Sequence, residues 1–234
     1  AQRPLAPRRG ALQELGGRVG KEAENNMIAV IDYGAGNLQS VAKALHHIGC
    51  GSAVVSAPAE LMEAEGAVLP GVGSFGDAMA CLERSGMRRA VLEYVSAGKP
   101  LLGICLGLQL LFGSSEESPG VAGLGLLEGS ITRIPPGEGL KIPHMGWNSL
   151  TIPHAGDLLA GVEEGSFVYF VHSYYLHAAD RSIVTAQTEY GVTIDAAVQS
   201  GNLFAAQFHP EKSGEVGLAM LRNFAALVGG REAR

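Results

Sequence analysis

The chain has 234 residues, a formal net charge of −6, 47% hydrophobic residues and 17% charged residues. This length allows one sizeable domain with a buried core, and the composition is that of an ordinary globular protein. The acidic balance argues against nucleic-acid binding, which needs clustered Lys and Arg, and no apolar run is long enough to cross a bilayer. We therefore expect a cytoplasmic protein that binds neither nucleic acid nor membrane.

The first 26 residues differ from the rest of the chain. They begin with a basic, turn-rich stretch and contain no apolar core of a secretory signal. We interpret residues 1–26 as a disordered leader or a non-native extension. A single domain is expected over residues 27–234, beginning at Met27.

The first half of the domain alternates between strand-like and helix-like segments. Short apolar runs that predict buried parallel strands cover residues 27–31, 53–55, 66–69 and 100–104. Helices are expected over residues 38–48, 77–84 and 87–97. This alternation predicts a flavodoxin-like α/β fold, with a mostly parallel central sheet and helices on both of its faces.

The second half is richer in strand-like segments separated by turn residues. These segments cover residues 166–171, 183–186, 195–199 and 203–208. Residues 200–202 predict a tight hairpin connection, and residues 215–227 predict a final helix. We expect the second half to add a smaller antiparallel sheet.

Cys105 stands out among the three cysteines. The segment Gly103-Ile104-Cys105-Leu106-Gly107 lies between a predicted strand and a predicted helix, which is the form of a nucleophile elbow. The helix N-terminus would favour the thiolate, and the N–H of Leu106 would point toward a developing oxyanion. The alternative is a buried, inert thiol, as we interpret Cys50 and Cys81.

A thiol nucleophile needs a base and a group that orients the base. His209 and Glu211 lie two residues apart at the end of a predicted strand, so their side chains point the same way. Pro210 between them cannot donate a ladder hydrogen bond, which fits a strand end. The alternative is an exposed loop histidine with an unrelated glutamate.

The sequence gives no sign of a metal or a cofactor. The other histidines lack metal-ligand spacing. Gly34 and Gly36 follow a strand, but a dinucleotide fingerprint would place its third glycine at position 39, which is Gln39. We therefore predict no metal site and no cofactor.

Together with Gln109, the elbow and the His209-Pro210-Glu211 segment resemble the class I (triad) glutamine amidotransferases. Within that family the chain is most similar to the glutaminase subunits of imidazole glycerol phosphate synthase, in histidine biosynthesis. The resemblance covers about residues 27–227. The segments that narrow it are residues 32–38, 69–75, 141–148 and 208–213.

The resemblance implies a hydrolysis of glutamine to glutamate and ammonia. Cys105 would attack the carboxamide and form a thioester, while His209 moves protons and Glu211 orients it. The oxyanion would be bound by the N–H groups of Val72 and Leu106. The residues that would contact glutamine are Gly71, Gly73, Gln109, Glu117, Ser173 and Tyr174.

The resemblance also implies a partner, the (β/α)8 synthase subunit of a heterodimer. That subunit would receive the ammonia and form imidazole glycerol phosphate and aminoimidazole carboxamide ribotide. The residues that would lie at this interface are Asn37, Met145, Trp147 and Lys212. For Trp147, the only tryptophan, a place in the core is the alternative.

Three other functions are compatible with parts of this pattern. The chain could serve another amidotransferase, in anthranilate, pyridoxal phosphate or nucleotide synthesis, although segments 70–73 and 143–148 argue against this. A stand-alone Cys hydrolase or peptidase of the same fold would turn over without a partner. The complete set of Cys105, His209 and Glu211 disfavours a non-catalytic binding subunit.

Overall fold

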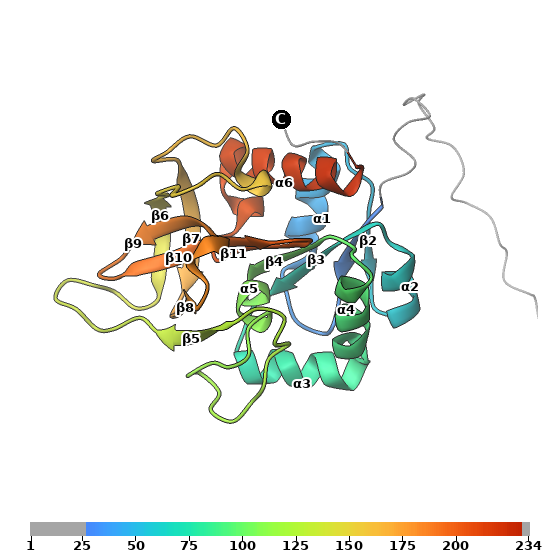
Figure 1. Cartoon of the computed structure of the whole chain (residues 1–234), viewed down its shortest axis with the longest axis horizontal. Helices are drawn as coiled ribbons and strands as arrows, with labels where there is room; N and C mark the ends of the chain where they lie inside the picture. The colour runs from blue at the N-terminus through green and yellow to red at the C-terminus, as the bar shows by residue number, and fades with distance from the viewer. Residues whose placement is uncertain (1–26, 231–234) are drawn as a thin grey trace, which may run out of the picture.

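A seven-stranded sheet forms the centre of the computed structural model, which describes residues 27–230 (Figure 1). The predicted leader, residues 1–26, lies outside the described residues. The strand order is β2-β1-β3-β4-β11-β10-β9. The strands of this sheet are β1 (Ile28–Ile31), β2 (Ser52–Val55), β3 (Gly66–Gly71), β4 (Leu101–Cys105), β9 (Val184–Glu189), β10 (Thr193–Ser200) and β11 (Leu203–Ala206).

Five neighbouring strands of the sheet, from β2 to β11, pair in parallel, and β10 and β9 extend it with antiparallel pairs. The prediction of a mostly parallel central sheet is therefore confirmed. Two separate antiparallel pairs flank it, β5 (Gly129–Arg133) with β8 (Tyr174–Ala178) and β6 (His144–Ser149) with β7 (Phe167–His172).

The prediction of smaller antiparallel structure in the second half is confirmed by these two short pairs. Strands β9, β10 and β11 belong to the central sheet, and only the two short pairs stand apart from it. The predicted hairpin at residues 200–202 is the reason, because it turns β11 back into the place beside β4. All four residues of β11 are buried, as expected of a strand covered on both faces.

Helices cover both faces of the sheet (Figure 1). The helix over residues 58–63 was not predicted; it is short and has Pro58 at its start. No helix within residues 27–230 is long and apolar enough to cross a membrane. The α-helices are α1 (Leu38–His47), α2 (Pro58–Glu63), α3 (Phe75–Ser85), α4 (Met87–Ser96), α5 (Leu106–Leu110) and α6 (Gly214–Val228), and the short 3-10 helices are η1 (Asp157–Leu159), η2 (Arg181–Ile183) and η3 (Pro210–Lys212).

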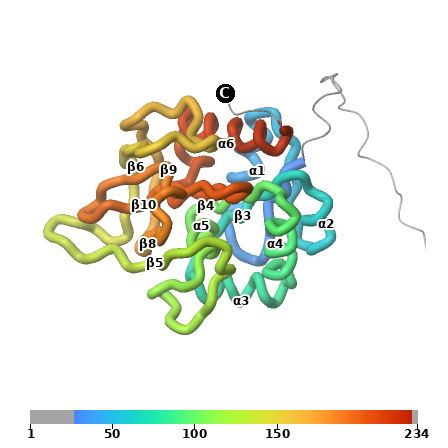
Figure 2. The backbone as a smooth tube through the Cα atoms, in the orientation of Figure 1, coloured from blue at the N-terminus to red at the C-terminus, as the bar shows by residue number. Residues whose placement is uncertain are grey.

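The two faces of the sheet have separate cores. Successive strand residues point to opposite faces, so Ile28 and Val30 of β1 join the core beneath α1 and α6, while Ala29 and Ile31 join the core beneath α2, α3 and α4. Figure 2 shows the consequence for the chain path, with α6 (red) returning to lie beside α1 (blue). Burial on both faces fixes the register of the parallel strands.

The register brings three loops to one edge of the sheet. Gly71 at the end of β3 pairs with Cys105 at the end of β4, and Ala206 of β11 pairs with Ile104. His209 follows β11 by three residues. The carboxyl ends of neighbouring parallel strands therefore place all three segments together, the usual position of a site in an open α/β sheet.

Candidate active site

The predicted elbow has a strained backbone at Cys105. Its φ of 55° makes it the one non-glycine residue with a positive φ in the part of the chain that the structure describes. A Cβ atom on Gly107 would lie 1.8 Å from the carbonyl oxygen of Leu69, and one on Gly103 would lie 2.8 Å from the carbonyl oxygen of Gly107. The small residues on either side of Cys105 are thus required for the turn to pass this close to β3.

Helix α5 behind the thiol is short, since it ends at Leu110 after five residues. A helix of little more than one turn contributes only a weak dipole. Helix α5 alone therefore gives the sulfur of Cys105 little electrostatic stabilisation.

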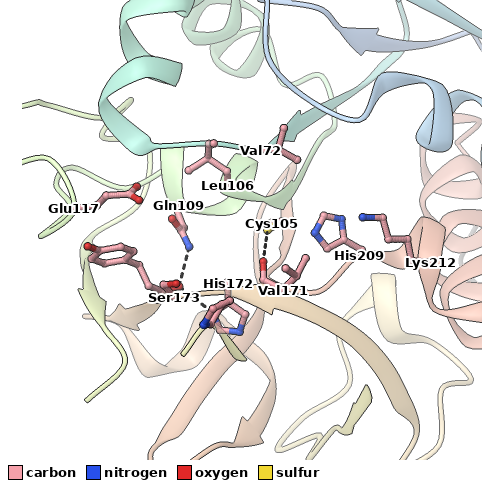
Figure 3. A pocket seen from close by; sticks show the side chains of 13 residues that line it. Val72, Cys105, Leu106, Gln109, Glu117, Val171, His172, Ser173, His209 and Lys212 are labelled. Carbon is pink, nitrogen blue, oxygen red and sulfur yellow. Dashed lines mark hydrogen bonds between the residues drawn. The ribbon is translucent and has the colours of Figure 1, made fainter. Parts of the chain in front are cut away.

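His209 lies beside Cys105 at the edge of the cavity (Figure 3). Its Nδ1 donates to Oε1 of Glu211 over 2.8 Å, and both side chains are almost fully buried. Burial lowers the pKa of His209, but interactions with Cys105 and Glu211 outweigh this effect and raise the pKa to about 9. Within residues 27–230, Nε2 of His209 has no regular hydrogen-bond partner, so it is free to exchange a proton with the nearby sulfur.

A cavity of about 300 Å³ opens beside the thiol. Most of the predicted site residues line it, and Glu211 stands behind His209. Gly71, Asn37, Met145 and Trp147 are not part of its lining. The predicted residues that line it are Val72, Gly73, Cys105, Leu106, Gln109, Glu117, Ser173, Tyr174, His209 and Lys212.

Two of the expected glutamine-binding side chains are held by the protein itself. Nε2 of Gln109 donates to the carbonyl oxygen of Tyr174 over 2.9 Å and to Oε1 of Gln207 over 3.0 Å. Oε2 of Glu117 accepts from the N–H of Phe75 over 2.7 Å. Other groups of the protein thus hold both side chains in place.

The loop after β3 passes directly over the elbow. A Cβ atom on Gly71 would lie 2.7 Å from Cβ of Leu106, so only glycine fits there. Gly73 has a φ of 95°, and Val72 between the two glycines is 44% exposed. The Tyr33 hydroxyl donates to the carbonyl oxygen of Pro70 over 3.0 Å and so anchors the start of the loop.

Tyr33, Gln207, His144 and His172 lie near the site but were not among the predicted site residues. The pairing of β6 with β7 places these two histidines opposite each other, with Nδ1 of His144 and Nε2 of His172 3.1 Å apart. Burial lowers the pKa of His144 to about 4 and that of His172 to about 3, so both are neutral. Only the strand register, which sequence spacing does not reveal, could have brought them together. No group of three or more potential metal-ligating side chains occurs between residues 27 and 230.

The expected interface residues lie outside the cavity or at its edge. Trp147 is 56% exposed, so it is not a core residue, and it meets Tyr169 edge to face with ring centroids 6.0 Å apart. Lys212 places Nζ 6.0 Å from the centroid of the Tyr169 ring. Asn37 is at the N-cap position of α1, and α1 contacts η3, which carries Lys212. We call the outward side of β6 and β7 the apolar face, formed by Met145, Trp147, Phe167, Tyr169 and Val171.

Comparison with known proteins identifies the family. The family model described as "Glutamine amidotransferase class-I" matches residues 29–228. The chain therefore belongs to the class-I glutamine amidotransferases.

The chain is 54% identical over 202 residues to the "Imidazole glycerol phosphate synthase subunit HisH" of Methanothermobacter thermautotrophicus, covering 86% of this chain and 99% of that protein. The subunit of the same name from Moorella thermoacetica is 52% identical over 201 residues, covering 86% of this chain and 95% of that protein. Within the amidotransferases, the chain belongs to the HisH family.

Solved structures show the same fold. A structure described as a glutamine amidotransferase has a TM-score of 0.69 and 21% identity, covering 86% of this chain and 98% of that one. The structure of PurLQS from Thermotoga maritima also has a TM-score of 0.69, with 23% identity over 87% of this chain and 99% of that one. These likenesses confirm the predicted fold class.

The buried histidines predict a maximum of stability near pH 6.5, the ordinary pKa of histidine. Below it, down to about pH 4, the unfolded chain binds protons that folded His144 and His172 do not, so the free energy of unfolding falls as the pH falls. Above it, up to about pH 9, folded His209 keeps a proton that the unfolded chain has released, so the free energy of unfolding falls as the pH rises.

Urea unfolding across this pH range measures both slopes. His172→Gln should flatten the acid slope, and His209→Gln should flatten the alkaline slope. The assignment is wrong if each variant keeps the pH profile of the parent chain.

Proposed function

We propose that this chain is the glutaminase subunit of an imidazole glycerol phosphate synthase, acting in histidine biosynthesis. The observation that carries the chemistry is the strained elbow at Cys105 beside the buried His209–Glu211 pair, all at one cavity. Membership of the HisH family, at about half identity over nearly the whole length of its members, supports the choice of enzyme.

The reaction begins with the thiolate of Cys105. Its sulfur attacks the carboxamide carbon of glutamine, and the carbonyl electrons move onto the oxygen. Because the pKa of His209 is raised to about 9, the imidazolium persists at neutral pH and can protonate the leaving nitrogen. Glu211 holds the ring and stabilises its positive charge.

The N–H groups of Leu106 and Val72 are our assignment for the oxyanion hole. Leu106 opens α5, where the first N–H groups have no partner within the helix. Gly71 keeps the Val72 loop in close contact with Leu106, since any larger residue would push the loop away. Donors placed in this way act on charge that develops in the transition state.

Release of ammonia leaves a glutamyl thioester on Cys105. Water then attacks the thioester with His209 as the base, which yields glutamate and the free thiol. We assign glutamine binding to Gly73, Gln109 and Glu117 and to the segment Ser173–Tyr174, which all line the cavity.

The partner in this proposal is the (β/α)8 synthase subunit, docked on the apolar face in a heterodimer. Met145 is 62% exposed, Trp147 56% and Phe167 58%, and three large apolar side chains gathered on one strand pair are typical of an interaction surface. Lys212 lies between this surface and the cavity, and we assign it and Asn37 to the same interface. Ammonia released at Cys105 would pass to the partner without being protonated in bulk water.

We place the enzyme in the cytoplasm. Cys81 and Cys105 form no disulfide within the described residues, and the proposed reaction needs Cys105 reduced. The cytosol keeps thiols reduced, whereas secretory compartments favour disulfides.

Cys105→Ala should abolish glutamine hydrolysis because it removes the nucleophile, while the fold and the apolar face stay intact. Release of glutamate in the presence of the synthase subunit measures the activity, and co-sedimentation with that subunit is the control. Cys81→Ala, a half-buried thiol of α3, should retain full activity. Retained hydrolysis in the Cys105 variant would sink the proposal.

Trp147→Ala should weaken the association with the synthase subunit by more than about tenfold, as loss of an aromatic anchor at an interface does. The glutaminase rate, which we expect to be low for the isolated chain, serves as the readout during titration with the partner. Val54→Ala is the matched control, because Val54 is 42% exposed on β2 at the far edge of the central sheet. An unchanged midpoint, or a full rate without any partner, contradicts the interface assignment.

A further inference from the structure

The sulfur of Cys105 has two polar neighbours besides His209. The carbonyl oxygen of Val171 and Nε2 of Gln207 each lie 3.8 Å from Sγ. A carbonyl oxygen only accepts, so it favours the protonated thiol, whereas an amide N–H donates and favours the thiolate. Which end of the Gln207 amide faces the sulfur is therefore important for reactivity.

The orientation of the Gln207 amide follows from a backbone acceptor, the carbonyl oxygen of Tyr174. The carbonyl oxygen of Tyr174 can only accept, so the Gln109 atom 2.9 Å away must be the NH₂ group. The same NH₂ group lies 3.0 Å from the Gln207 side chain, and two NH₂ groups cannot bond to each other, so it faces Oε1 of Gln207. The NH₂ end of Gln207 is left to face Cys105.

The carbonyl oxygen of Tyr174 also lies within hydrogen-bond distance of His172. Nδ1 of His172 lies 3.0 Å from the carbonyl oxygen of Tyr174, and Nε2 of His172 faces Nδ1 of His144 over 3.1 Å. Both histidines are neutral, so each carries one ring proton. Because the carbonyl oxygen of Tyr174 can only accept, the proton of His172 is on Nδ1. Nε2 of His172 is then an acceptor, so the proton of His144 is also on Nδ1. His144 then donates to His172, and His172 donates to Tyr174. All hydrogen bonds from His144 to the sulfur have matched donors and acceptors.

Burial separates this chain of amides from solvent. Gln207 has no exposed surface, and Gln109 is 4% exposed. Burying a polar amide costs free energy unless its groups are bonded, and a hydrogen bond to an ionised partner is stronger than one between neutral groups. A position facing the reactive sulfur gives the buried amide of Gln207 such a partner.

We propose that Gln207 belongs to the catalytic machinery, stabilising the Cys105 thiolate by donating a hydrogen bond from Nε2 to Sγ. This inference rests on the proposed role of Cys105 as the nucleophile. It also supplies the stabilisation that the short helix α5 does not provide. The orientation of the donor is set by the bonds that run through Gln109 and Tyr174 to the two histidines.

Other titratable groups also surround the sulfur. Their effect on its alkylation should be the same in the parent chain and in every Gln207 variant. They come from the loop after β1, the loop after α5, β7, and η3 with the residue that precedes it. These groups are Tyr33, Glu117, His172, His209, Glu211 and Lys212.

The test is the pH dependence of Cys105 alkylation by iodoacetamide in the full-length chain. The thiolate displaces iodide and forms a thioether, and mass spectrometry of the peptide that contains Cys105 separates it from Cys50 and Cys81. Gln207→Met removes the donor with little change of volume. We expect alkylation about tenfold slower at neutral pH, a midpoint shifted to higher pH, and the same plateau at alkaline pH.

Two further variants define the outcome. Gln207→Asn keeps a buried amide but withdraws it from the sulfur, so it should shift the midpoint in the same direction and serves if Gln207→Met does not fold. Gln199→Met is the matched control on β10, where Gln199 accepts from the N–H of Asp157 far from the cavity, and it should behave as the parent chain.

The inference is overturned if the folded Gln207 variants keep the parent midpoint. It is also overturned if only the plateau rises, since that indicates a looser cavity. The readout does not require glutaminase activity. An unshifted midpoint together with an inactive Cys105→Ala variant would therefore reject the role of Gln207 and leave the proposed function standing.

Discussion

The structure depends on one close contact, the passage of Gly107 against the backbone of Leu69. Because a single carbon atom at this position would overlap the carbonyl oxygen, β4 can turn sharply into α5 only with glycine there. The turn forces Cys105 into a positive φ, which costs free energy. The packing of the surrounding buried sheet must offset this cost. In return, the thiol stands at the strand end, where the loop after β3 and the segment after β11 converge.

Two different sets of groups surround the thiol of Cys105. His209, with a pKa raised to about 9, keeps its second ring proton at neutral pH, and Glu211 accepts a hydrogen bond from Nδ1 of its ring. On the other side of the sulfur, the two buried glutamines form part of a hydrogen-bonded chain that ends at a pair of neutral histidines. Because β7 contributes both to this hydrogen-bonded chain and to the apolar face, a partner docked on that face would contact the same strand that contacts the sulfur of Cys105.

The sequence was most informative where chemistry and local structure coincide. The apolar strands, the elbow around Cys105 and the pairing of His209 with Glu211 all follow from spacing, and the structure places them together. Contacts that depend on register were not predictable, because nothing local indicates that His144 lies opposite His172 or that Gln207 reaches the sulfur. The place of β9, β10 and β11 in the central sheet was not predictable for the same reason, since a hairpin alone does not reveal which strand lies beside it. The exposure of Trp147 likewise required the strand pair to be seen.

The central claim is that the sulfur of Cys105 becomes covalently bound to the substrate. The most direct measurement is mass spectrometry of the chain quenched in acid while it turns over glutamine with its synthase partner. The account predicts a glutamyl adduct on the peptide that contains Cys105, lost on treatment with hydroxylamine as a thioester would be. Steady turnover with no adduct there, or with the adduct on another residue, would contradict it.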